Sequence, residues 1–590
     1  MIARHFIKIF LISLTLISTS YNQNQAIKSF LVIGNKVFSQ KDYLEWSGIK
    51  INQFVSNDIS DSIANRILKA LSSNGYYFAK INSIEKNIID SSSIGIVIHL
   101  EEDSPVIISA VNFIVEDSSD LKLFENRFES FLGKTLNKYD LEEVFQNILT
   151  YFENNGYPFI KISIQSILFD VDTLSSERKA DLLLKIDKGL LSKIDLVEVR
   201  GNQSTKDYVI IRELRLNKGD LYSQKKIEEL PARLNRLRFF EPVKNPSFYI
   251  NKKDEGVLVI EVKEKQTNNF DGIIGYIPPS QNETSGYITG LINISLRNLF
   301  GTGRAISLKW NKFSRNSQEL DLKYLEPWLF NFPFNISISL YQRIQDTTYV
   351  QRQVEASFVY LATETISASL ILGTESVIPT ERTIPVFTVF NSTLLTSGLN
   401  FKLDTRDDPY SPTKGILFNN TYLFSRKKIN GPIEFITPSV EKEINLQRII
   451  SDFEIYLSLF KRQVAALSLH ARELRGKSFE NTDLFKFGGT NSLRGYREEQ
   501  FLGNRLLWSN IEYRFLLTAR TFVFAFYDFG YYLREAVKSK NILKGESFLY
   551  GYGIGLNIET ALGVLGVSFA LGKDDSFSEG KIHFGLVNEF

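Results

Sequence analysis

Residues 334–340 read FNISISL, and this short stretch decides how the second half of the chain folds. Its apolar residues, Phe334, Ile336, Ile338 and Leu340, occupy every second position, with small polar residues between them. Successive side chains of a β-strand point to opposite faces of the sheet, so a period of two predicts a strand with one apolar and one polar face. A strand of this kind suits a membrane barrel, whose outer face contacts lipid and whose inner face contacts an aqueous lumen.

The same alternation recurs in residues 306–310 and 453–459. The region from residue 268 to the end has 323 residues (590 − 268 + 1), which divided by sixteen gives about 20 residues for each strand and its connection. We therefore expect an all-β antiparallel transmembrane barrel over residues 267–590, with sixteen strands; composition leaves fourteen or eighteen open. A soluble β-sandwich is the alternative, but its strands are shorter, at about five or six residues. Three of the four tryptophans lie in this half, as an aromatic girdle requires: Trp310, Trp328 and Trp508.

The first half repeats itself. Residues 74–81, NGYYFAKI, recur as residues 155–162, NGYPFIKI, at a spacing of 81 (156 − 75), and Gly34-Asn35 recurs as Gly201-Asn202 at a spacing of 167 (201 − 34). A fixed period of this length indicates tandem modules. We expect three α+β repeats with the element order β-α-α-β-β, over residues 27–103, 104–188 and 189–266.

Each repeat contains a helix ahead of its turn. In the first, Ile59, Ile63, Ile67 and Leu71 lie four residues apart and form one apolar stripe. In the second, Asp140 and Glu143 have the spacing of a capping box. In the third, Pro231 lies inside the helical pattern and should shorten or kink the helix.

The first 26 residues predict a secretory signal peptide. Arg4 and Lys8 precede a mostly apolar stretch, residues 9–17, and a polar segment follows it. Nine residues fall well short of the ~20 that a membrane-spanning helix requires.

Composition excludes several functions. The net charge is +2, so no basic field exists to attract nucleic acid. The chain has no cysteine and four scattered histidines, which excludes thiol catalysis and makes a metal site improbable. It contains no phosphate-binding Gly-x-x-x-x-Gly-Lys-Ser/Thr loop and no Gly-x-Ser-x-Gly elbow, and Asp407 and Asp408 lie together in a turn. We therefore expect no enzyme activity, no catalytic residue, no cofactor and no metal.

The tandem repeats resemble the POTRA domains of outer-membrane assembly and secretion proteins. Four motifs in the second half resemble the barrels of one family of such proteins, the BamA/TamA family. The most specific is residues 487–496, FGGTNSLRGY, which is similar to that family's loop six. The others are residues 298–303, NLFGTG, residues 404–415, DTRDDPYSPTKG, and residues 526–530, FYDFG. The repeat number and compact length look closest to TamA in layout.

This resemblance implies a set of site residues. Loop six, near residues 487–500, would fold into the barrel lumen, and its arginine would be received by an aspartate on a neighbouring strand. A guanidinium can make two parallel hydrogen bonds to one carboxylate, worth ~1.5–3 kcal/mol away from bulk water. The lock would comprise Gly488, Gly489, Leu493, Arg494, Gly495, Tyr496 and Asp528. The two turn motifs would contribute Asn298, Gly301, Gly303, Asp404, Arg406, Asp407 and Gly415, and the seam and C-terminal signal would contribute Phe584, Gly585 and Phe590.

The function implied is that of an outer-membrane assembly factor, an insertase. Its POTRA repeats would lie in the periplasm and receive unfolded outer-membrane or secreted protein clients, which would enter the lipid bilayer where the first strand, near residues 268–276, meets the last, residues 581–590. Gly585 would bend the last strand there. Periplasmic accessory lipoproteins or a TamB-like protein would be further partners, and nucleic acid would not. The alternative is a two-partner secretion pore, which usually has two POTRA repeats behind a plug helix.

Overall fold

The computed structural model describes residues 25–55, 59–90, 93–116, 120–171, 177–278, 285–380, 387–408, 411–438, 440–536, 543–560 and 563–587. Most of the predicted signal peptide and Phe590 lie outside these ranges. The chain divides into two compact units. The first extends to Leu196 and includes residues 217–228 and 249–257, and the second contains residues 197–216, 229–248 and Leu258–Phe590.

The first α/β module has a four-stranded sheet in the order β2-β1-β4-β3, in which β1 and β4 are parallel. Helix α2 places Ile63, Ile67 and Leu71 in the core against β4, as the spacing of these residues predicts. The elements are β1 Gln25–Ile33, α1 Gln40–Ser47, β2 Phe54–Val55, α2 Ser60–Ser73, β3 Lys80–Asp90 and β4 Ser93–Glu101.

The second module repeats this plan with a sheet in the order β5-β7-β6, in which β5 and β7 are parallel. Aromatic side chains join it to the first module, since the ring of Phe169 lies 5.5 Å from that of Tyr77 and 5.3 Å from that of Phe78. The elements are β5 Val106–Val115, α3 Leu121–Phe128, η2 Glu129–Phe131, α4 Lys138–Asn154, β6 Lys161–Val171 and β7 Arg178–Asp187.

The third module has a three-stranded sheet in the order β11-β12-β9 and a short pair, β10-β8. Its elements are β8 Lys193–Ile194, β9 Leu196–Arg200, α5 Asp207–Leu214, β10 Asp220–Leu221, α6 Gln224–Leu237, β11 Ser247–Ile250 and β12 Gly256–Glu261. No described helix in the chain is long and apolar enough to cross a membrane.

The repeated glycines occupy equivalent positions. Gly75 and Gly156 have φ angles of 94° and 95°, and Gly34 and Gly201 have φ angles of 99° and 88°. A Cβ on Gly34 would lie 1.9 Å from the carbonyl oxygen of Leu100, and one on Gly201 would lie 2.0 Å from that of Val262. The backbone therefore requires glycine at both places, which explains why the dipeptide recurs.

One local expectation is wrong, and a second is wrong in part. Helix α4 begins after Asn137, whose side chain accepts a hydrogen bond from the amide of Tyr139, so Asp140 and Glu143 lie inside the helix and form no capping box. Helix α6 continues through Pro231 for fourteen residues and is not shortened. Proline removes one backbone hydrogen bond, but Leu230 and Leu234 are fully buried, and this packing outweighs the loss.

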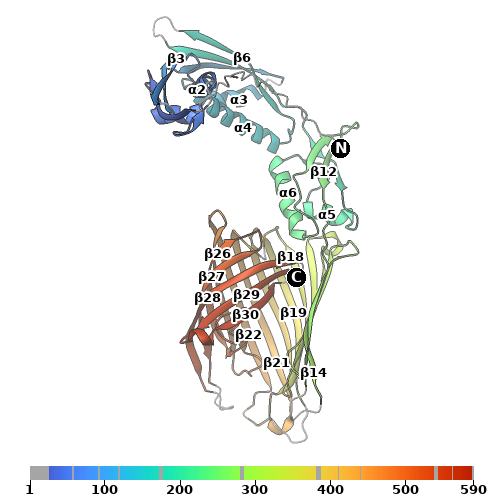
Figure 1. Ribbon diagram of the computed structural model, residues 1–590. Helices are drawn as coiled ribbons and strands as arrows, with labels where there is room; N and C mark the ends of the chain where they lie inside the picture. Colours follow the sequence, from blue (N-terminus) through green and yellow to red (C-terminus); the bar gives the residue numbers. More distant parts are fainter. Residues whose placement is uncertain are drawn as a thin grey trace, which may run out of the picture. The chain divides into compact units, whose positions relative to one another are not determined.

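The second half forms one antiparallel sheet of sixteen strands, which curves into the barrel of Figure 1. The expected fold class, α+β repeats followed by a sixteen-stranded antiparallel barrel, is confirmed. Its strands are β13 Asn269–Ile277, β14 Tyr287–Leu299, β15 Arg304–Lys312, β16 Gln318–Glu326, β17 Phe334–Gln345, β18 Tyr349–Leu361, β19 Ile366–Pro379, β20 Asn391–Asp404, β21 Gly415–Gly431, β22 Glu443–Phe460, β23 Gln463–Gly476, β26 Arg505–Leu516, β27 Phe522–Arg534, β28 Gly545–Thr560, β29 Gly563–Gly572 and β30 Lys581–Val587.

In the described part of this half, the remaining elements are three short helical turns and a small hairpin. The turns are η3 Leu329–Asn331, η4 Ile433–Phe435 and η6 Phe577–Glu579, and the hairpin is β24 Phe485–Phe487 with β25 Phe501–Gly503.

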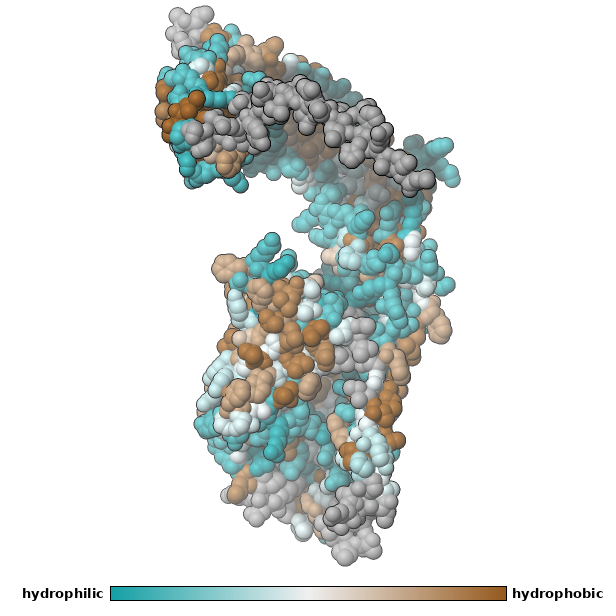
Figure 2. All heavy atoms as spheres, viewed as in Figure 1, coloured by the Kyte–Doolittle hydropathy of each residue, from teal (hydrophilic) through white to brown (hydrophobic). Residues whose placement is uncertain are grey.

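The strands alternate as expected. On β27, Phe522, Phe524, Phe526 and Asp528 are buried, while Val523 and Tyr527, which alternate with them, are exposed. On β22, Leu457 and Leu459 are exposed and Tyr456 is buried. Figure 2 shows hydrophobic side chains gathered on the outer face over β27 to β30, where a lipid-contacting surface is needed.

The expected tryptophan girdle is wrong for two of its three members. Trp508 is buried and stacks on His470 inside the barrel, with ring centroids 4.7 Å apart. Trp328 is buried too, and its indole N–H donates to Glu213 of α5 at 2.6 Å. Both indoles are used for internal packing, and phenylalanine and tyrosine supply most of the exposed aromatic surface.

We predict that Gly34→Ala destabilises the first module by about 2–4 kcal/mol, because the new Cβ combines a left-handed backbone with a clash against Leu100. Gly133→Ala is the control. Gly133 also has a positive φ, 77°, but nothing lies within 4 Å of its Cβ position, so the second module should lose only about 1 kcal/mol. Hydrogen exchange of each module's amides measures both losses. Equal losses would show that the close approach at Gly34 has no energetic effect.

Candidate functional site

The connection from β23 to β26, residues 477–504, is the long loop in which loop six was expected. It contains the β24–β25 hairpin and buries Phe487, Leu493 and Tyr496 against Leu506, Trp508 and Leu549 of the barrel wall. Gly488, Gly489 and Gly495 all have positive φ angles. At Gly495 a Cβ would lie 2.7 Å from the backbone nitrogen of Gly572, so this turn of the loop meets the wall too closely for any side chain.

Arg494 is the best-connected residue of the loop. Its Nε and Nη2 donate to the two carboxylate oxygens of Asp528 at 2.8 and 2.7 Å, and its backbone N–H donates to the same carboxylate at 3.0 Å. Its Nη1 donates to Glu512 at 2.7 Å, and the guanidinium lies 3.7 Å from the ring centroid of Phe526. Asp528 is fully buried. The structure thus brings Arg494 and Asp528 together in the bidentate geometry that makes such pairs strong.

The prediction missed Glu512, Arg514, Phe526 and His583. Glu512 is shared, since it also accepts from Nε and Nη2 of Arg514 at 2.8 Å. The signal for Glu512 and Arg514 was present, because they alternate along β26 with Ile511, Tyr513 and Phe515, which are exposed. The rings of Phe522, Phe524 and Phe526 occupy every second position of β27 in phase with Asp528, so the same period of two could have placed them on the lumen face.

Two further ion-pair groups fasten the loop. Glu499 accepts from Nη1 and Nη2 of Arg343 on β17 at 3.1 and 2.9 Å, and from Lys486 at 2.8 Å. Nearer the start of the loop, the fully buried Lys427 of β21 donates to Glu480 at 2.9 Å and to Asp483 at 2.7 Å. The loop is therefore held by three separate parts of the sheet: β17, β21 and the adjacent pair β26 and β27.

The tip of the loop also contacts the last described strand. The N–H of Gly495 donates to Nε2 of His583 at 3.0 Å, and a Cβ on Gly585 would lie 3.2 Å from the side chain of Thr490. Phe584 faces away and is exposed, and the pairing of β29 with β30 runs through Gly585 with no shift in register. A cavity of about 840 Å³ lies beside this contact, with Asn293, Arg494, Glu512 and His583 among its lining residues.

The first turn motif lies at the other end of the barrel. Asn298 accepts from the amide of Gly303 at 2.9 Å and donates to the hydroxyl of Thr205 in the third module at 2.8 Å. A Cβ on Gly301 would lie 1.9 Å from the carbonyl oxygen of Ser204. Asn298, Gly301 and Gly303 therefore shape a turn that contacts Ser204 and Thr205, which belong to the same compact unit.

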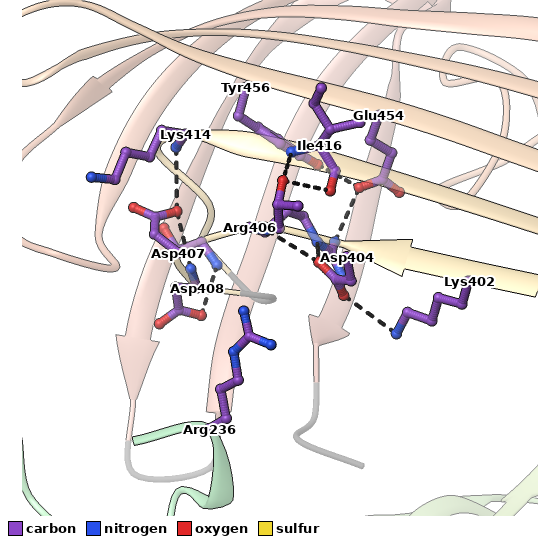
Figure 3. Close-up of polar contacts among 12 residues, drawn as sticks. Arg236, Lys402, Asp404, Arg406, Asp407, Asp408, Lys414, Ile416, Glu454 and Tyr456 are labelled. Carbon is purple, nitrogen blue, oxygen red and sulfur yellow. Dashed lines mark hydrogen bonds and ion pairs between the residues drawn. The ribbon is translucent and has the colours of Figure 1, made fainter. Parts of the chain in front are cut away.

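The second turn motif is shown in Figure 3. Arg406 makes two hydrogen bonds of 2.9 Å to Asp404 and a third of 3.1 Å to Glu454. Gly415 has a φ of 107°, and a Cβ there would lie 2.5 Å from the carbonyl oxygen of Thr405.

The neighbouring acids of that turn have separate roles. Burial opposes ionisation of Asp407, but hydrogen bonds from Thr413 and Lys414 outweigh it and hold the pKa of this carboxyl below its usual value. Asp408 instead pairs with Arg238 of the third module at 3.3 Å and with Arg520 at 2.8 Å. Because both carboxylates have structural partners, their pairing gives no sign of acid–base chemistry.

Both halves of the chain are similar to known protein families. Residues 298–590 match the Omp85 superfamily domain, and residues 25–103 and 192–265 match the POTRA model, described as a surface antigen variable number repeat. The outer membrane protein assembly factor BamA of Nitratidesulfovibrio vulgaris is 26% identical over 415 residues, 64% of this chain and 48% of that protein. BamA of Neisseria meningitidis is 23% identical over 242 residues, 40% of this chain and 28% of that protein. The chain therefore spans about half of these curated relatives, or less.

The crystal structure of BamA from Haemophilus ducreyi lacking POTRA domains 1–3 has the same fold. It superposes with a TM-score of 0.52 at 16% sequence identity and covers 81% of this chain and 98% of its own.

We predict that Arg494→Ala releases loop six. The substitution leaves the buried Asp528 carboxylate without its partner, a loss of about 3–5 kcal/mol for a buried pair. Hydrogen exchange should accelerate across residues 487–500, and single-channel conductance should rise. The control is Arg475→Ala, which removes an arginine that is 58% exposed and should cost at most about 1 kcal/mol. Unchanged exchange and conductance in Arg494→Ala would show that the pair does not hold the loop.

Proposed function

The chain is of the BamA/TamA type, with POTRA repeats ahead of an Omp85 superfamily domain, and on this premise we propose that it is an outer-membrane protein assembly factor. It is an outer-membrane β-barrel protein. Unfolded β-barrel clients bind to its POTRA repeats and enter the bilayer at the junction between its first and last barrel strands.

The order of the barrel sheet carries this proposal. The hydrogen-bonded order runs from β13 to β30, and among the described residues no ladder joins these two end strands. Backbone groups left unpaired in lipid cost several kcal/mol each. A client strand that pairs with either end strand recovers this energy, so the junction favours strand addition. The client's own folding supplies the driving force, and we propose no enzyme activity.

The POTRA repeats offer a second place for strand addition. Strand β6 lies at the end of its sheet and exposes Ile164, Leu168 and Val171. An extended client can add to such an edge through main-chain hydrogen bonds, which do not depend on its sequence. Weak, sequence-independent binding suits a receptor for many different clients.

The placement of the repeats and the accessory partners belong to the same proposal. The repeats lie in the periplasm, where clients arrive unfolded, and accessory lipoproteins or a TamB-like protein bind there. The likeness to TamA in layout stays a prediction from the number of repeats.

The filled lumen disfavours the alternative, a two-partner secretion pore. Arg494, Glu499, Glu480 and Asp483 hold the loop across the interior, so a polypeptide could pass only after three ion-pair groups had broken. A large, steadily open conductance of the wild-type protein would favour the pore instead.

We predict that sealing the barrel junction stops client insertion. The chain has no cysteine, so two engineered cysteines can form a disulfide only with each other and with no native thiol. Ile582→Cys is combined in turn with single cysteines along β13, and the protein is reconstituted in liposomes with a denatured barrel client. In those pairs that oxidise, insertion should fall to the uncatalysed rate and recover on reduction.

The matched control joins Ile582→Cys to Phe569→Cys. These residues are register partners on β29 and β30, so their disulfide leaves the junction free and insertion unchanged. If β13–β30 cross-linked protein inserts clients as fast as this control, strand addition at the junction is wrong.

A further inference from the structure

A second cavity lies at the end of the barrel that contacts the third module. Its volume is about 330 Å³, and it is enclosed by α5, the last turns of α6 and the ends of strands β14 to β18. All of its lining residues belong to the second compact unit. Five arginines and two glutamates contribute to the wall: Arg212, Arg215, Arg233, Arg236, Arg297, Glu213 and Glu364.

The two glutamates already have partners. Glu364 pairs with Arg233 at 2.8 Å, and Glu213 accepts the indole N–H of Trp328 at 2.6 Å. Burial raises the pKa of Glu213, while the hydrogen bond from Trp328 and the neighbouring Arg212 and Arg215 act in the opposite direction. The acids therefore neutralise only part of the positive charge in the wall.

Arg212 and Arg215 lie near Glu213 but form no direct ion pair with it. Among the described residues neither forms a salt bridge; Arg212 donates to the carbonyl oxygen of Thr302 at 3.2 Å and Arg215 to that of Ala362 at 3.3 Å. The Nε–H of Arg212 is buried and has no hydrogen-bond acceptor in the described part of the chain. Burial also lowers the pKa of Arg212, as expected for a cation that is incompletely compensated.

The other arginines matter less. Arg233 is paired, and Figure 3 shows Arg236 extending toward the turn that carries Asp407 and Asp408. Arg212 and Arg215, at the C-terminal end of α5, are therefore the arginines of the wall that are best placed to bind an anion.

The rest of the wall is apolar. Leu325, Pro327, Trp328 and Leu361 line the cavity. In the same region, the turns that follow β14 and β16 expose Phe300, Phe330 and Phe332, at 86%, 84% and 62% of their surface. Large exposed aromatic side chains at a barrel end are typical of the level of the lipid headgroups. A ligand of this cavity would thus meet cations and apolar surface together, beside the membrane interface.

We propose that this cavity binds the phosphate group of an anionic glycerophospholipid from the adjacent leaflet. Arg212 and Arg215 donate to the phosphate oxygens, and the apolar wall contacts the glycerol and the first acyl carbons. Guanidinium groups are suited to phosphate because they present several donors in a rigid plane. The proposal goes beyond client assembly, since it concerns what the base of the barrel binds and not what the barrel inserts.

The same chemistry would also accept free phosphate, and the experiment separates the two sources. The full chain is purified in a non-ionic detergent and titrated with short-chain phosphatidylglycerol, with phosphatidylcholine of equal chain length, and with inorganic phosphate. Native mass spectrometry reports the bound species. We expect one phosphatidylglycerol to bind more tightly than phosphatidylcholine, and inorganic phosphate to compete poorly because it lacks the apolar part.

The variants Arg212→Gln and Arg215→Gln should each weaken phosphatidylglycerol binding about tenfold, equivalent to about 1.4 kcal/mol. Arg215→Lys should retain most of the affinity, since it keeps the charge. Arg426→Gln is the matched control. Arg426 is paired with Glu443 at the far end of β21 and also loses one positive charge, so its affinity should equal that of the wild type.

Three results would overturn the proposal. One is equal binding of the two lipids by the wild type. Another is wild-type affinity in both glutamine variants, with barrel folding verified for each by heat-dependent mobility in SDS gels. The third is competition by inorganic phosphate as strong as that by phosphatidylglycerol, which would assign the site to a soluble anion.

Discussion

The ion pair of Arg494 with Asp528 is the interaction on which the interior of the barrel depends. Asp528 is fully buried, and within the described part of the chain its hydrogen-bond donors are the guanidinium and backbone N–H of Arg494, a loop residue. Ordering a loop of this length costs conformational entropy, and burying a carboxylate costs solvation. Each group offsets part of the cost of the other, so the pair holds the loop against the wall.

The sequence predicted what depends on local geometry. Gly75 and Gly156, or Gly34 and Gly201, recur because the backbone at those points excludes a side chain, and alternation along β27 follows from the strand itself. The sequence could not predict which charged side chains form ion pairs across the lumen. The resemblance to a family supplied Asp528 as the partner of Arg494, but Glu512 as a second partner depends on the register between β26 and β27 and on where the loop descends.

Trp508 and Trp328 show the same limit. Tryptophan is frequent at membrane interfaces, and both residues were expected there. Both indoles are instead buried: one stacks on His470, and the N–H of the other donates to Glu213. Tryptophan is stable both at a membrane interface and in a protein interior, so the surrounding residues decide where each one lies. Pro231 is a related case, because the burial of Leu230 and Leu234 decides the helix against a local preference.

The fastenings of the loop differ in how firmly they hold the two sides of the barrel. Asp528, Lys427 and Asp483 are almost completely shielded from water, whereas Glu499, which reaches Arg343 on β17, is 43% exposed. Water weakens a pair of that kind, so the contact with β17 contributes less to holding the loop than the buried pairs on β21 and β27 do. Loop six is therefore retained mainly by strands of the second half of the barrel sheet.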